Sequence, residues 1–534
     1  MLPVVQFAWG EIMQARVQAT LLILTLICVR AAAMVEIGYE NDNRSLTVTG
    51  AATTFSTNGV RLGYKGNHNR LNILNGASMS SAESYIGWTS YEFYYGDGIP
   101  ADDNVVNVAG VGSRWDAGRL RVGFGPSSVN NQLRVAGGGE VEAESCLIGV
   151  YAGNANQVLV SDPGSRLTVT ESGDFNGFTI GYRGGGHALI VSNGASLASA
   201  DAIIGYGHFI YPCEGNRALI SGAGTTWNSG AIQVGTGPYA LNNALVIRDG
   251  AVVHSTSARI ETVASEPRSI GNHVAVEGVG SKWNLAQGLV MKSYDPLTPS
   301  ELAIADGGEV EASWIAIFDD AEPASQIHLY HGGTLTIRSD FDASMPGFSF
   351  NDGGTLRVGG QLSGLSALDA GRRLEASDLL GSLTLEGTFA PGNSPAESTL
   401  SGDLTVAAIG TLEMELGGYA LGAEYDHLTV TGTATLDGTL SVLFMDGFSV
   451  TNGARFDLFD WEGGASGRFS SIVAPTLSSG LSWDSSELYS TGHLSVIPEP
   501  GTAGLLLVAG AGLYLSRSRR ARSGTCRRSR RWRR

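Results

Sequence analysis

A short pattern that returns about every 25 to 30 residues, from about Asn43 to about residue 340, constrains the fold of this chain more than any other feature. In each repeat, a turn of small residues is followed by one large apolar residue. A longer GxGSxW-like version alternates with a shorter GAxL-like version, so the repeating unit is a pair of roughly 55 residues. Aligned on the turn, the large apolar positions are Phe55, Met79, Trp115, Val141, Leu167, Leu197, Trp227, Val253, Trp283, Val310 and Leu335.

Within each repeat, apolar and polar residues alternate in runs of about four to six residues that end at Gly, Asn, Asp or Ser. This alternation is typical of β-strands. One such coil is too small to bury its own apolar face, whereas coils stacked at about 4.8 Å share one core and pair their backbones. The sequence therefore predicts an all-β protein in which residues 34–340 form a parallel β-helix, a solenoid roughly 50 Å long.

After residue 340 the repeat is lost, although strand-like alternation continues to about residue 495. We expect a second β-rich region over 341–495 that continues or caps the solenoid. Residues 1–33 are expected to be a signal peptide, because Arg16 precedes an apolar stretch and Ala31–Ala33 would form the cleavage region. Short apolar helices are expected at the N- and C-terminal ends.

Two sets of repeated side chains bear on the interior. Trp115, Trp227 and Trp283 share one register, and a core position is favoured over an exposed carbohydrate platform, because Phe55 and Leu167 occupy equivalent places. A polar residue also precedes the first apolar run of many repeats, and it would form either a stacked amide ladder or a row of solvated turn residues. These polar residues are Asn69, Asn131, His187, Asn216, Asn243 and His273.

Composition narrows the class of protein and of partner. The 74 glycines and the 16% share of charged residues favour a turn-rich, extended β protein. The formal net charge is -17, but ten arginines follow Pro500, so residues 34–500 hold 22 Lys and Arg against 50 Asp and Glu, a net of -28. Such an acidic body argues against nucleic acid as a partner. A disulfide between Cys146 and Cys213 is left open.

The segment 496–522 has the order of a sorting signal. Pro498, Glu499 and Pro500 disfavour a continuous helix and indicate a hinge. The apolar run that follows is backed by basic residues, an order that would halt it in a membrane with its tail in the cytoplasm. The nearest basic residues are Arg517, Arg519 and Arg520, and a basic tail covers 523–534.

This terminus resembles the PEP-CTERM sorting signal of exopolysaccharide-producing bacteria, through its Pro-Glu-Pro tripeptide, short apolar run and arginine cluster. The resemblance implies processing by a membrane exosortase, transient or persistent membrane anchoring through a C-terminal helix, and export to the cell surface or extracellular matrix. The coils resemble the autotransporter-like repeats that accompany such signals, with the GxGSxW signature matched at Trp115, Trp227 and Trp283. The segments APGNSP at 390–395 and YDHLTVTG at 425–432 resemble the strand-rich region of the same proteins.

Two aromatic-rich insertions interrupt the coils, Tyr91–Asn104 and Tyr206–Gly215. Insertions in a solenoid lie in loops, often on one face, so these are the candidate ligand-binding segments. The candidate contacts with sugar rings are Tyr91, Phe93, Tyr94 and Tyr95, and Asp97, Asp102 and Asp103 offer oxygen ligands for calcium. The simpler interpretation of both sets is a solvated loop, and no metal site is predicted.

No cluster of carboxylates recurs in register, and no GxSxG, HExxH or phosphate-binding motif is present, so no catalytic residue and no cofactor is predicted. We expect an adhesin-like scaffold of the cell surface or extracellular matrix, with exopolysaccharide as candidate ligand and an exosortase as processing partner. The alternative is a carbohydrate-active enzyme, a polysaccharide lyase or hydrolase, in which Asp319 and Asp320 or the loop aspartates lie in one groove. A self-assembling surface filament is a third alternative.

Overall fold

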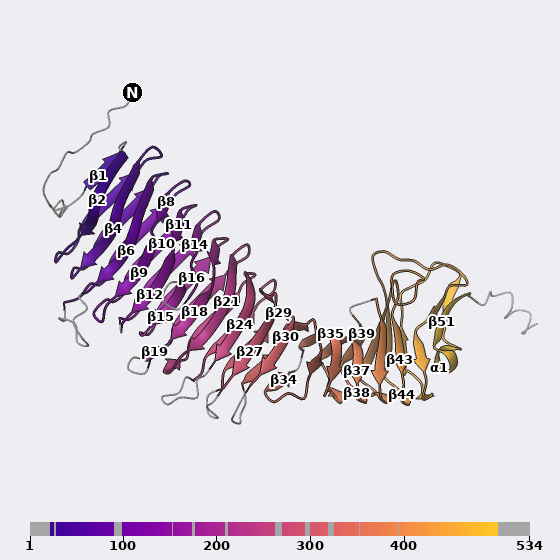
Figure 1. Ribbon diagram of the computed structural model, residues 1–534. Helices are drawn as coiled ribbons and strands as arrows, with labels where there is room; N and C mark the ends of the chain where they lie inside the picture. Colours follow the sequence, from indigo (N-terminus) through magenta and orange to yellow (C-terminus); the bar gives the residue numbers. More distant parts are fainter. Residues whose placement is uncertain are drawn as a thin grey trace, which may run out of the picture. The chain divides into compact units, whose positions relative to one another are not determined.

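The computed structural model (Figure 1) describes residues 22–25, 28–89, 99–151, 153–173, 177–208, 212–261, 270–293, 299–318, 325–351, 353–392 and 395–499. The chain divides into two compact units, Met1–Gly381 and Ser382–Arg534.

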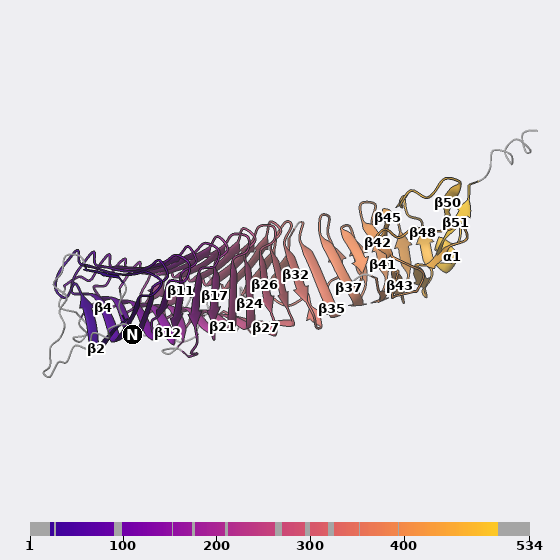
Figure 2. The same cartoon turned by 90° about the horizontal axis from the view of Figure 1, so that it is seen from above.

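The first unit is a parallel β-solenoid whose coils stack their strands in three rows, and strands of successive coils follow one another along the unit (Figures 1 and 2). We name the three rows of strands ribbon 1, ribbon 2 and ribbon 3, in the order in which the chain meets them in each coil. Ribbon 1 consists of β1 (Leu22–Thr25), β3 (Ser45–Thr49), β5 (Arg70–Leu74), β7 (Val105–Ala109), β10 (Gln132–Ala136), β13 (Gln157–Ser161), β16 (Ala188–Ser192), β20 (Arg217–Ser221), β23 (Ala244–Arg248), β25 (His273–Glu277), β28 (Glu301–Ala305), β31 (Gln326–Leu329) and β34 (Phe348–Phe350).

Ribbons 2 and 3 belong to a second parallel sheet. Long strands supply both ribbons at β2 (Cys28–Ile37), β4 (Thr54–Tyr64), β6 (Ser78–Trp88), β21 (Thr226–Thr236), β24 (Val252–Glu261), β35 (Thr355–Ser363) and β37 (Arg373–Leu380). Elsewhere ribbon 2 has β8 (Arg114–Asp116), β11 (Glu140–Ala143), β14 (Arg166–Val169), β17 (Ser196–Ser199), β26 (Lys282–Leu285), β29 (Glu309–Ala312) and β32 (Thr334–Ile337). Ribbon 3 has β9 (Arg119–Phe124), β12 (Ser145–Val150), β15 (Phe178–Tyr182), β18 (Ala202–Tyr206), β27 (Gly288–Lys292), β30 (Trp314–Ile317) and β33 (Phe341–Asp342). The short strands β19 (Cys213–Glu214) and β22 (Ala240–Leu241) pair with each other, and β36 is Ala367–Leu368.

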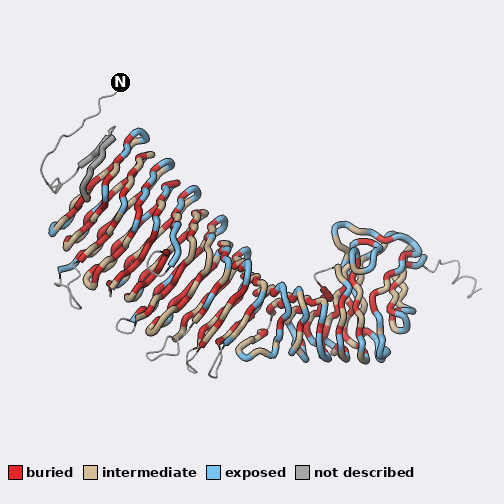
Figure 3. Tube along the Cα trace, viewed as in Figure 1, coloured by how far each residue is buried: buried red, intermediate tan, exposed pale blue. Residues whose placement is uncertain are grey.

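The strand register confirms the alignment of the repeats and the predicted parallel β-helix. Each aligned apolar position pairs with its equivalent one coil away, from Phe55 with Met79 to Val310 with Leu335. All of these positions are buried. Buried residues alternate with more exposed ones along the strands, as Figure 3 shows, because successive side chains of a strand point to opposite faces.

The interior explains why long and short repeats alternate. Trp115, Trp227 and Trp283 are fully buried, so the predicted core position is confirmed and the exposed platform is wrong. Each indole N–H donates to a serine hydroxyl of the preceding, shorter coil, at distances of 3.1, 3.0 and 3.0 Å. The acceptors are Ser81, Ser199 and Ser255. A buried indole N–H requires an acceptor, so the two kinds of coil form a matched pair.

The polar corner residues form a buried ladder, which resolves the alternative that the sequence left open. The backbone N–H of each member donates to the side chain of the next, as from Asn216 to Asn243 at 3.2 Å and from Asn243 to Asn272 at 3.0 Å. The prediction of His273 is wrong: Asn272 is the fully buried member, whereas His273 begins β25 and is only partly buried. The ladder consists of Asn69, Asn104, Asn131, Asn156, His187, Asn216, Asn243 and Asn272.

A column of glycines makes room for the ladder. Gly205 is the last but one residue of β18 and has a φ of +84°. A Cβ built on it would lie 2.2 Å from the side-chain amide carbon of Asn243. The same contact recurs at Gly63, Gly87, Gly123, Gly149, Gly181 and Gly235, each against the ladder residue of the next coil. These corner glycines therefore combine a left-handed backbone with a contact that excludes any side chain.

The expected N-terminal apolar helix is not found among the described residues. Leu22–Thr25 and Cys28–Ile37 are strands that pair in parallel with β3 and β4. An apolar segment rich in β-branched residues can form its backbone hydrogen bonds with the open edge of the first coil as well as within a helix. The C-terminal apolar run lies outside the described residues, and within the described ones no helix has the length and apolarity needed to span a bilayer.

Cys146 and Cys213 are both free thiols in the buried interior. The Cys213 thiol donates to the Gly181 carbonyl at 3.0 Å. Burial raises the pKa of each thiol to about 12, so both remain protonated and unreactive at neutral pH.

The second unit also builds coils of parallel strands. Its three rows are β38-β41-β44-β48, β39-β42-β45-β49 and β40-β43-β47. The unit also contains an antiparallel sheet of β46, β51 and β50 and the single-turn helix α1. The bounds are β38 (Leu383–Leu385), β39 (Thr388–Pro391), β40 (Glu397–Ser401), β41 (Leu404–Val406), β42 (Thr411–Leu416), β43 (His427–Val430), β44 (Ala434–Leu436), β45 (Thr439–Phe444), β46 (Arg455–Asp457), β47 (Phe459–Trp461), β48 (Ala465–Gly467), β49 (Ser471–Val473), β50 (Leu481–Asp484), α1 (Leu488–Thr491) and β51 (His493–Pro498).

Candidate functional site

The corner where ribbon 3 ends and the next ribbon 1 begins carries both aromatic insertions. Tyr91–Asn104 connects β6 to β7, and Tyr206–Gly215 runs from the end of β18 toward β20. The predicted contacts Tyr91, Phe93, Tyr94 and Tyr95 lie outside the described residues, as does Asp97. The described ends of the two insertions lie at the same corner of the solenoid.

A row of aromatic side chains follows this corner from coil to coil, and we call it the aromatic row. Its members are Tyr39, Tyr64, Trp88, Phe124, Tyr151, Tyr182 and Tyr206. Most of them directly follow a corner glycine, as Tyr64 follows Gly63. The glycine must turn the chain around the ladder residue, so the next side chain leaves the interior at the same place in each coil.

The rings of the aromatic row are in contact along the unit. Successive ring centroids are 4.8, 5.0, 6.3, 5.5, 6.3 and 5.2 Å apart, in the order of the chain. Most of these separations are close to the strand spacing of about 4.8 Å, because paired strands set one ring above another. Tyr85 lies three residues before Trp88 on β6, and its ring centroid is 5.2 Å from that of Trp88 and 5.5 Å from that of Phe124.

Most members of the aromatic row are half-buried, and Tyr182 is the exception at 1% exposed. Burial raises the pKa of Tyr182 to about 12, and burial is also the main cause of a raised pKa at Tyr85. Their phenols therefore stay protonated throughout the physiological pH range and remain hydrogen-bond donors as well as acceptors. The row thus offers apolar ring surface, and the half-exposed Tyr85 beside it adds a neutral hydroxyl group.

Cations border the aromatic row. The Arg61 guanidinium lies 4.0 Å from the Trp88 ring centroid and 3.0 Å from a Glu36 carboxylate oxygen. Arg183 lies 4.9 Å from the Tyr182 ring centroid. Such contacts hold the rings in place and add donors at the edge of the row.

The aromatic row was not predicted, although the sequence carries a signal for it. The second apolar run of a coil ends near glycine, and the residue after that glycine is aromatic in most coils. In the order of the chain these steps read IGY, LGY, IGW, VGF, IGVY, IGY and IGY. An aromatic residue that repeats directly after an obligatory glycine predicts a surface row.

The loop aspartates do not form a metal site in the described part of the chain. Asp102 accepts a hydrogen bond from the Val129 amide at 2.8 Å, and burial raises the pKa of its carboxyl. Asp103 lies 3.5 Å from His68. Neither belongs to a group of three or more metal-binding side chains, and none occurs elsewhere among the described residues. Asp319 and Asp320 lie outside them.

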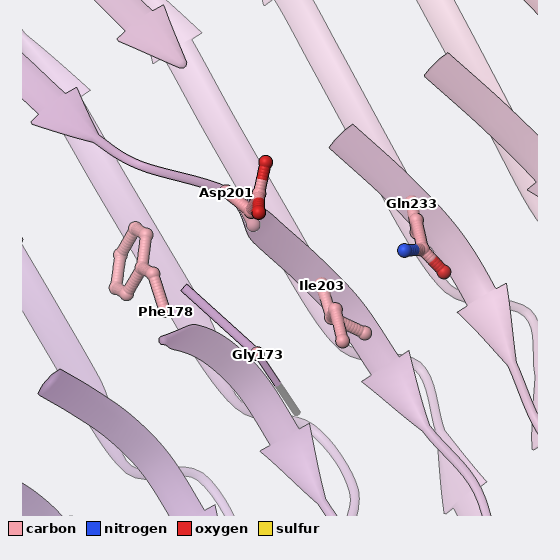
Figure 4. A pocket seen from close by; sticks show the side chains of 6 residues that line it. Gly173, Phe178, Asp201, Ile203 and Gln233 are labelled. Carbon is pink, nitrogen blue, oxygen red and sulfur yellow. The ribbon is translucent and has the colours of Figure 1, made fainter. Parts of the chain in front are cut away.

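A small depression of about 50 Å³ on ribbon 3 contains one carboxylate (Figure 4). Asp201 lines it together with Phe178, Ile203 and Gln233. The Asp201 carboxylate accepts a hydrogen bond from the Ala231 amide at 2.7 Å, which assigns it to a contact between coils. A volume of this size takes a water molecule or two but not a sugar ring.

The predicted sorting residues are only partly described. Pro498 ends β51 opposite Leu481, and the Glu499 amide donates to the Gly480 carbonyl at 2.8 Å. Both residues are exposed. Pro500, Arg517, Arg519 and Arg520 lie outside the described residues.

No protein-family model and no curated protein matches this sequence. Among solved structures, the chain is similar to one described as the "Crystal structure of TibC-catalyzed hyper-glycosylated TibA55-350 fragment", at 13% sequence identity. The match covers 82% of this chain and 97% of that chain, with a TM-score of 0.19. At that score the two structures do not superpose as wholes.

Proposed function

We propose that this chain is an exported, adhesin-like scaffold of the cell surface or extracellular matrix, and that it holds exopolysaccharide along the aromatic row. One observation supports the ligand class above all others: ring after ring, from Tyr39 to Tyr206, occupies the same corner of the solenoid. A polysaccharide is the kind of ligand that repeats in one dimension, as this surface does.

The chemistry of the row fits a sugar polymer. Pyranose rings present C–H groups on their faces and hydroxyls on their edges, and aromatic side chains with a polar tip match both. The half-exposed Tyr85, which contacts Trp88, supplies a hydroxyl that both donates and accepts, and Arg61 supplies further donors beside Trp88. Because the row is built on paired strands, its geometry is rigid and little ordering is required on binding.

The same surface favours binding over cleavage. Hydrolysis or elimination needs two titratable groups that face one bond of the substrate. Asp102 and Asp201, on or near ribbon 3, each accept a backbone amide of a neighbouring coil and so serve the solenoid itself. This supports a role as scaffold rather than as enzyme.

Delivery to the surface would use the C-terminal segment. We propose that a membrane exosortase recognises Pro498, Glu499 and Pro500 together with the apolar run and Arg517, Arg519 and Arg520. The exposure of Pro498 and Glu499 at the end of the last strand supports access by a processing enzyme.

The ligand proposal is tested by co-sedimentation of the full chain, purified from the producing cells, with their own insoluble exopolysaccharide. We expect retention of the wild type and at least a fivefold loss for the triple variant Tyr64→Leu, Trp88→Leu, Phe124→Leu. Tyr330→Leu, which removes a 39% exposed aromatic away from the row, is the matched control. Equal retention of the triple variant would refute the row as the contact, and new reducing or unsaturated sugar ends would show an enzyme instead.

The sorting proposal is tested in the producing cells by replacing the Pro-Glu-Pro tripeptide with three alanines. Full-length precursor should accumulate in the membrane fraction, as it should in cells that lack exosortase activity. Normal amounts of processed protein at the surface of the variant strain would refute recognition of this motif.

A further inference from the structure

The coils that follow the aromatic row carry a groove of about 330 Å³ on the outer face of ribbon 3. It crosses four neighbouring strands, β21, β24, β27 and β30. At the usual strand spacing this is a length of about 14 Å. The groove is therefore much larger than the depression beside Asp201 and has room for a short chain of sugars.

Small residues form its floor. Ala231 pairs with Ser257 across β21 and β24, and the register of the next strands brings Gly288 beside Ser257. Gly288 in turn pairs with Trp314 of β30. The surface is thus low over Ala231 and Ser257, and the indole of Trp314 closes the end of the groove over Gly288.

Trp314 lies flat at the end of the groove. A Cβ built on Gly288 would lie 2.3 Å from both Cδ2 and Cε2 of Trp314, the two atoms shared by the indole rings, so the ring covers Gly288 with its face. The side chain remains 42% exposed, unlike the fully buried Trp227 and Trp283. An exposed indole face seated on glycine is a rigid stacking platform.

Polar groups line the same groove. Gln233 and Arg259 are register partners on β21 and β24, and Gln287 directly precedes Gly288. Arg259 Nε lies 3.1 Å from Glu261 Oε1, so its charge is already paired. The lining therefore offers several hydrogen-bond donors and acceptors but little net charge.

We infer that this groove binds an uncharged oligosaccharide segment, with one pyranose ring stacked on Trp314 and hydroxyls hydrogen-bonded to Gln233 and Arg259. The inference rests on the proposed polysaccharide-binding function and names a second contact on the same ribbon. The neutral class follows from the Arg259–Glu261 pair and from the net charge of -28 over residues 34–500, which repels anionic glycans.

The test is isothermal titration of the full chain with neutral hexasaccharides of glucose, mannose and galactose, and with hexagalacturonate as the anionic counterpart. At least one neutral hexasaccharide should bind, and Trp314→Ala should weaken that binding at least tenfold. Ser257→Arg, which fills the floor and leaves the indole in place, should weaken it equally. Tyr330→Ala, which also removes a partly exposed aromatic, is the matched control and should bind as the wild type does.

Several outcomes would overturn the inference. Unchanged affinity in both groove variants would exclude the groove, and tighter binding of hexagalacturonate would exclude the neutral class. Absence of all hexasaccharide binding would also exclude it, while retention on exopolysaccharide, measured separately, would still support the aromatic row. Conversely, hexasaccharide binding that depends on Trp314 without retention on exopolysaccharide would keep the groove and refute the proposed ligand.

Discussion

At the scale of single residues, the corner ladder acts as an extension of the backbone. The Asn243 side-chain oxygen accepts both the backbone amide and the side-chain amide of Asn216, at 3.2 and 2.9 Å. Both donors are fully buried, and each would cost about 1 to 3 kcal/mol if left without an acceptor. The ladder therefore helps to fix the register of the corner, beside the short pairing of β19 with β22.

Gly205→Ala should be strongly destabilising, because its Cβ would lie 2.2 Å from Asn243 at φ +84. We expect a loss of about 3 kcal/mol or more in the free energy of unfolding, measured by urea titration. Gly215→Ala is the matched control, since Gly215 has φ +67 but nothing within 4 Å of the added Cβ. It should cost only about 1 kcal/mol of backbone strain, and equal losses would refute the steric role of the ladder.

His187→Asn should make the first unit more resistant to acid. Burial lowers the pKa of His187 to about 4, below its unfolded value of about 6.5, so the unfolded chain binds the proton first. The stability that neutral His187 contributes is therefore fully present above about pH 6.5. It is lost as pH falls toward 4, which lowers the free energy of unfolding by about 3 kcal/mol in total. Melting temperatures between pH 7.5 and 4.5 should fall less for His187→Asn than for the wild type.

The matched control for this variant is His273→Asn, which changes the partly buried histidine beside Asn272. It should leave the acid dependence of melting unchanged. An equal effect of both substitutions would show that general charge, rather than the ladder position, sets the acid sensitivity.

At the scale of strands and coils, the indole–serine contacts join the three tryptophan-bearing coils to the coil before each of them. Ser255→Ala should cost about 1 to 3 kcal/mol, because it leaves the buried Trp283 N–H without its acceptor at 3.0 Å. In a Trp283→Phe background the same change should cost little, since Phe has no N–H to satisfy. A double-mutant cycle in urea should give a coupling of about 1 kcal/mol, and simple additivity would contradict the pairing.

The same elements show what sequence reasoning can and cannot reach. The interior row was predictable because a large residue after a glycine turn has one place to go in a stacked coil. The ladder was not, because an asparagine at a turn is equally common in water, and only the fit of Asn243 against Gly205 distinguishes the two. The choice of His273 over Asn272 failed because two adjacent polar residues leave the alignment uncertain by one position.

The ends of the chain were harder to predict for a physical reason. The apolar stretch around Leu22–Thr25 has the composition of a leader helix and of an edge strand alike, and the pairing of β1 with β3 is a property of the partner edge. The aromatic row was missed because rings separated by a whole coil become neighbours only when the coils are stacked. Trp314 was missed for the same reason, since its seat on Gly288 joins two coils.

At the scale of the whole molecule, the second unit should respond to pH in the opposite sense to the first. Burial raises the pKa of Asp426 to about 7. The backbone amides of Ala396 and Glu415 donate to its carboxylate at 2.9 and 2.7 Å and lower the pKa, but burial has the larger effect. The folded state therefore holds a proton that the unfolded state releases above about pH 4. Stability from this group is highest in acid and declines as pH rises toward 7.

Calorimetry of the full chain between pH 5 and pH 8 should show one transition that moves to lower temperature by several degrees as pH rises. Asp426→Asn should flatten that dependence. Asp437→Asn, at an exposed carboxyl whose pKa is lowered mainly by a hydrogen bond from Ser470, should leave it unchanged. A slope that persists in the Asp426 variant would assign the effect to another group.

From Trp227 to Val310 the interior alternates between indoles and smaller residues, and this alternation limits how such a gene can lengthen or shorten. Removing the single coil around Val253 would bring Trp227 and Trp283 into adjacent layers of a core in which both are already fully enclosed. Removing that coil together with its neighbour would restore the original sequence of layers. Recombination within this array should therefore be tolerated in steps of two coils, so that natural variants differ in length by whole pairs.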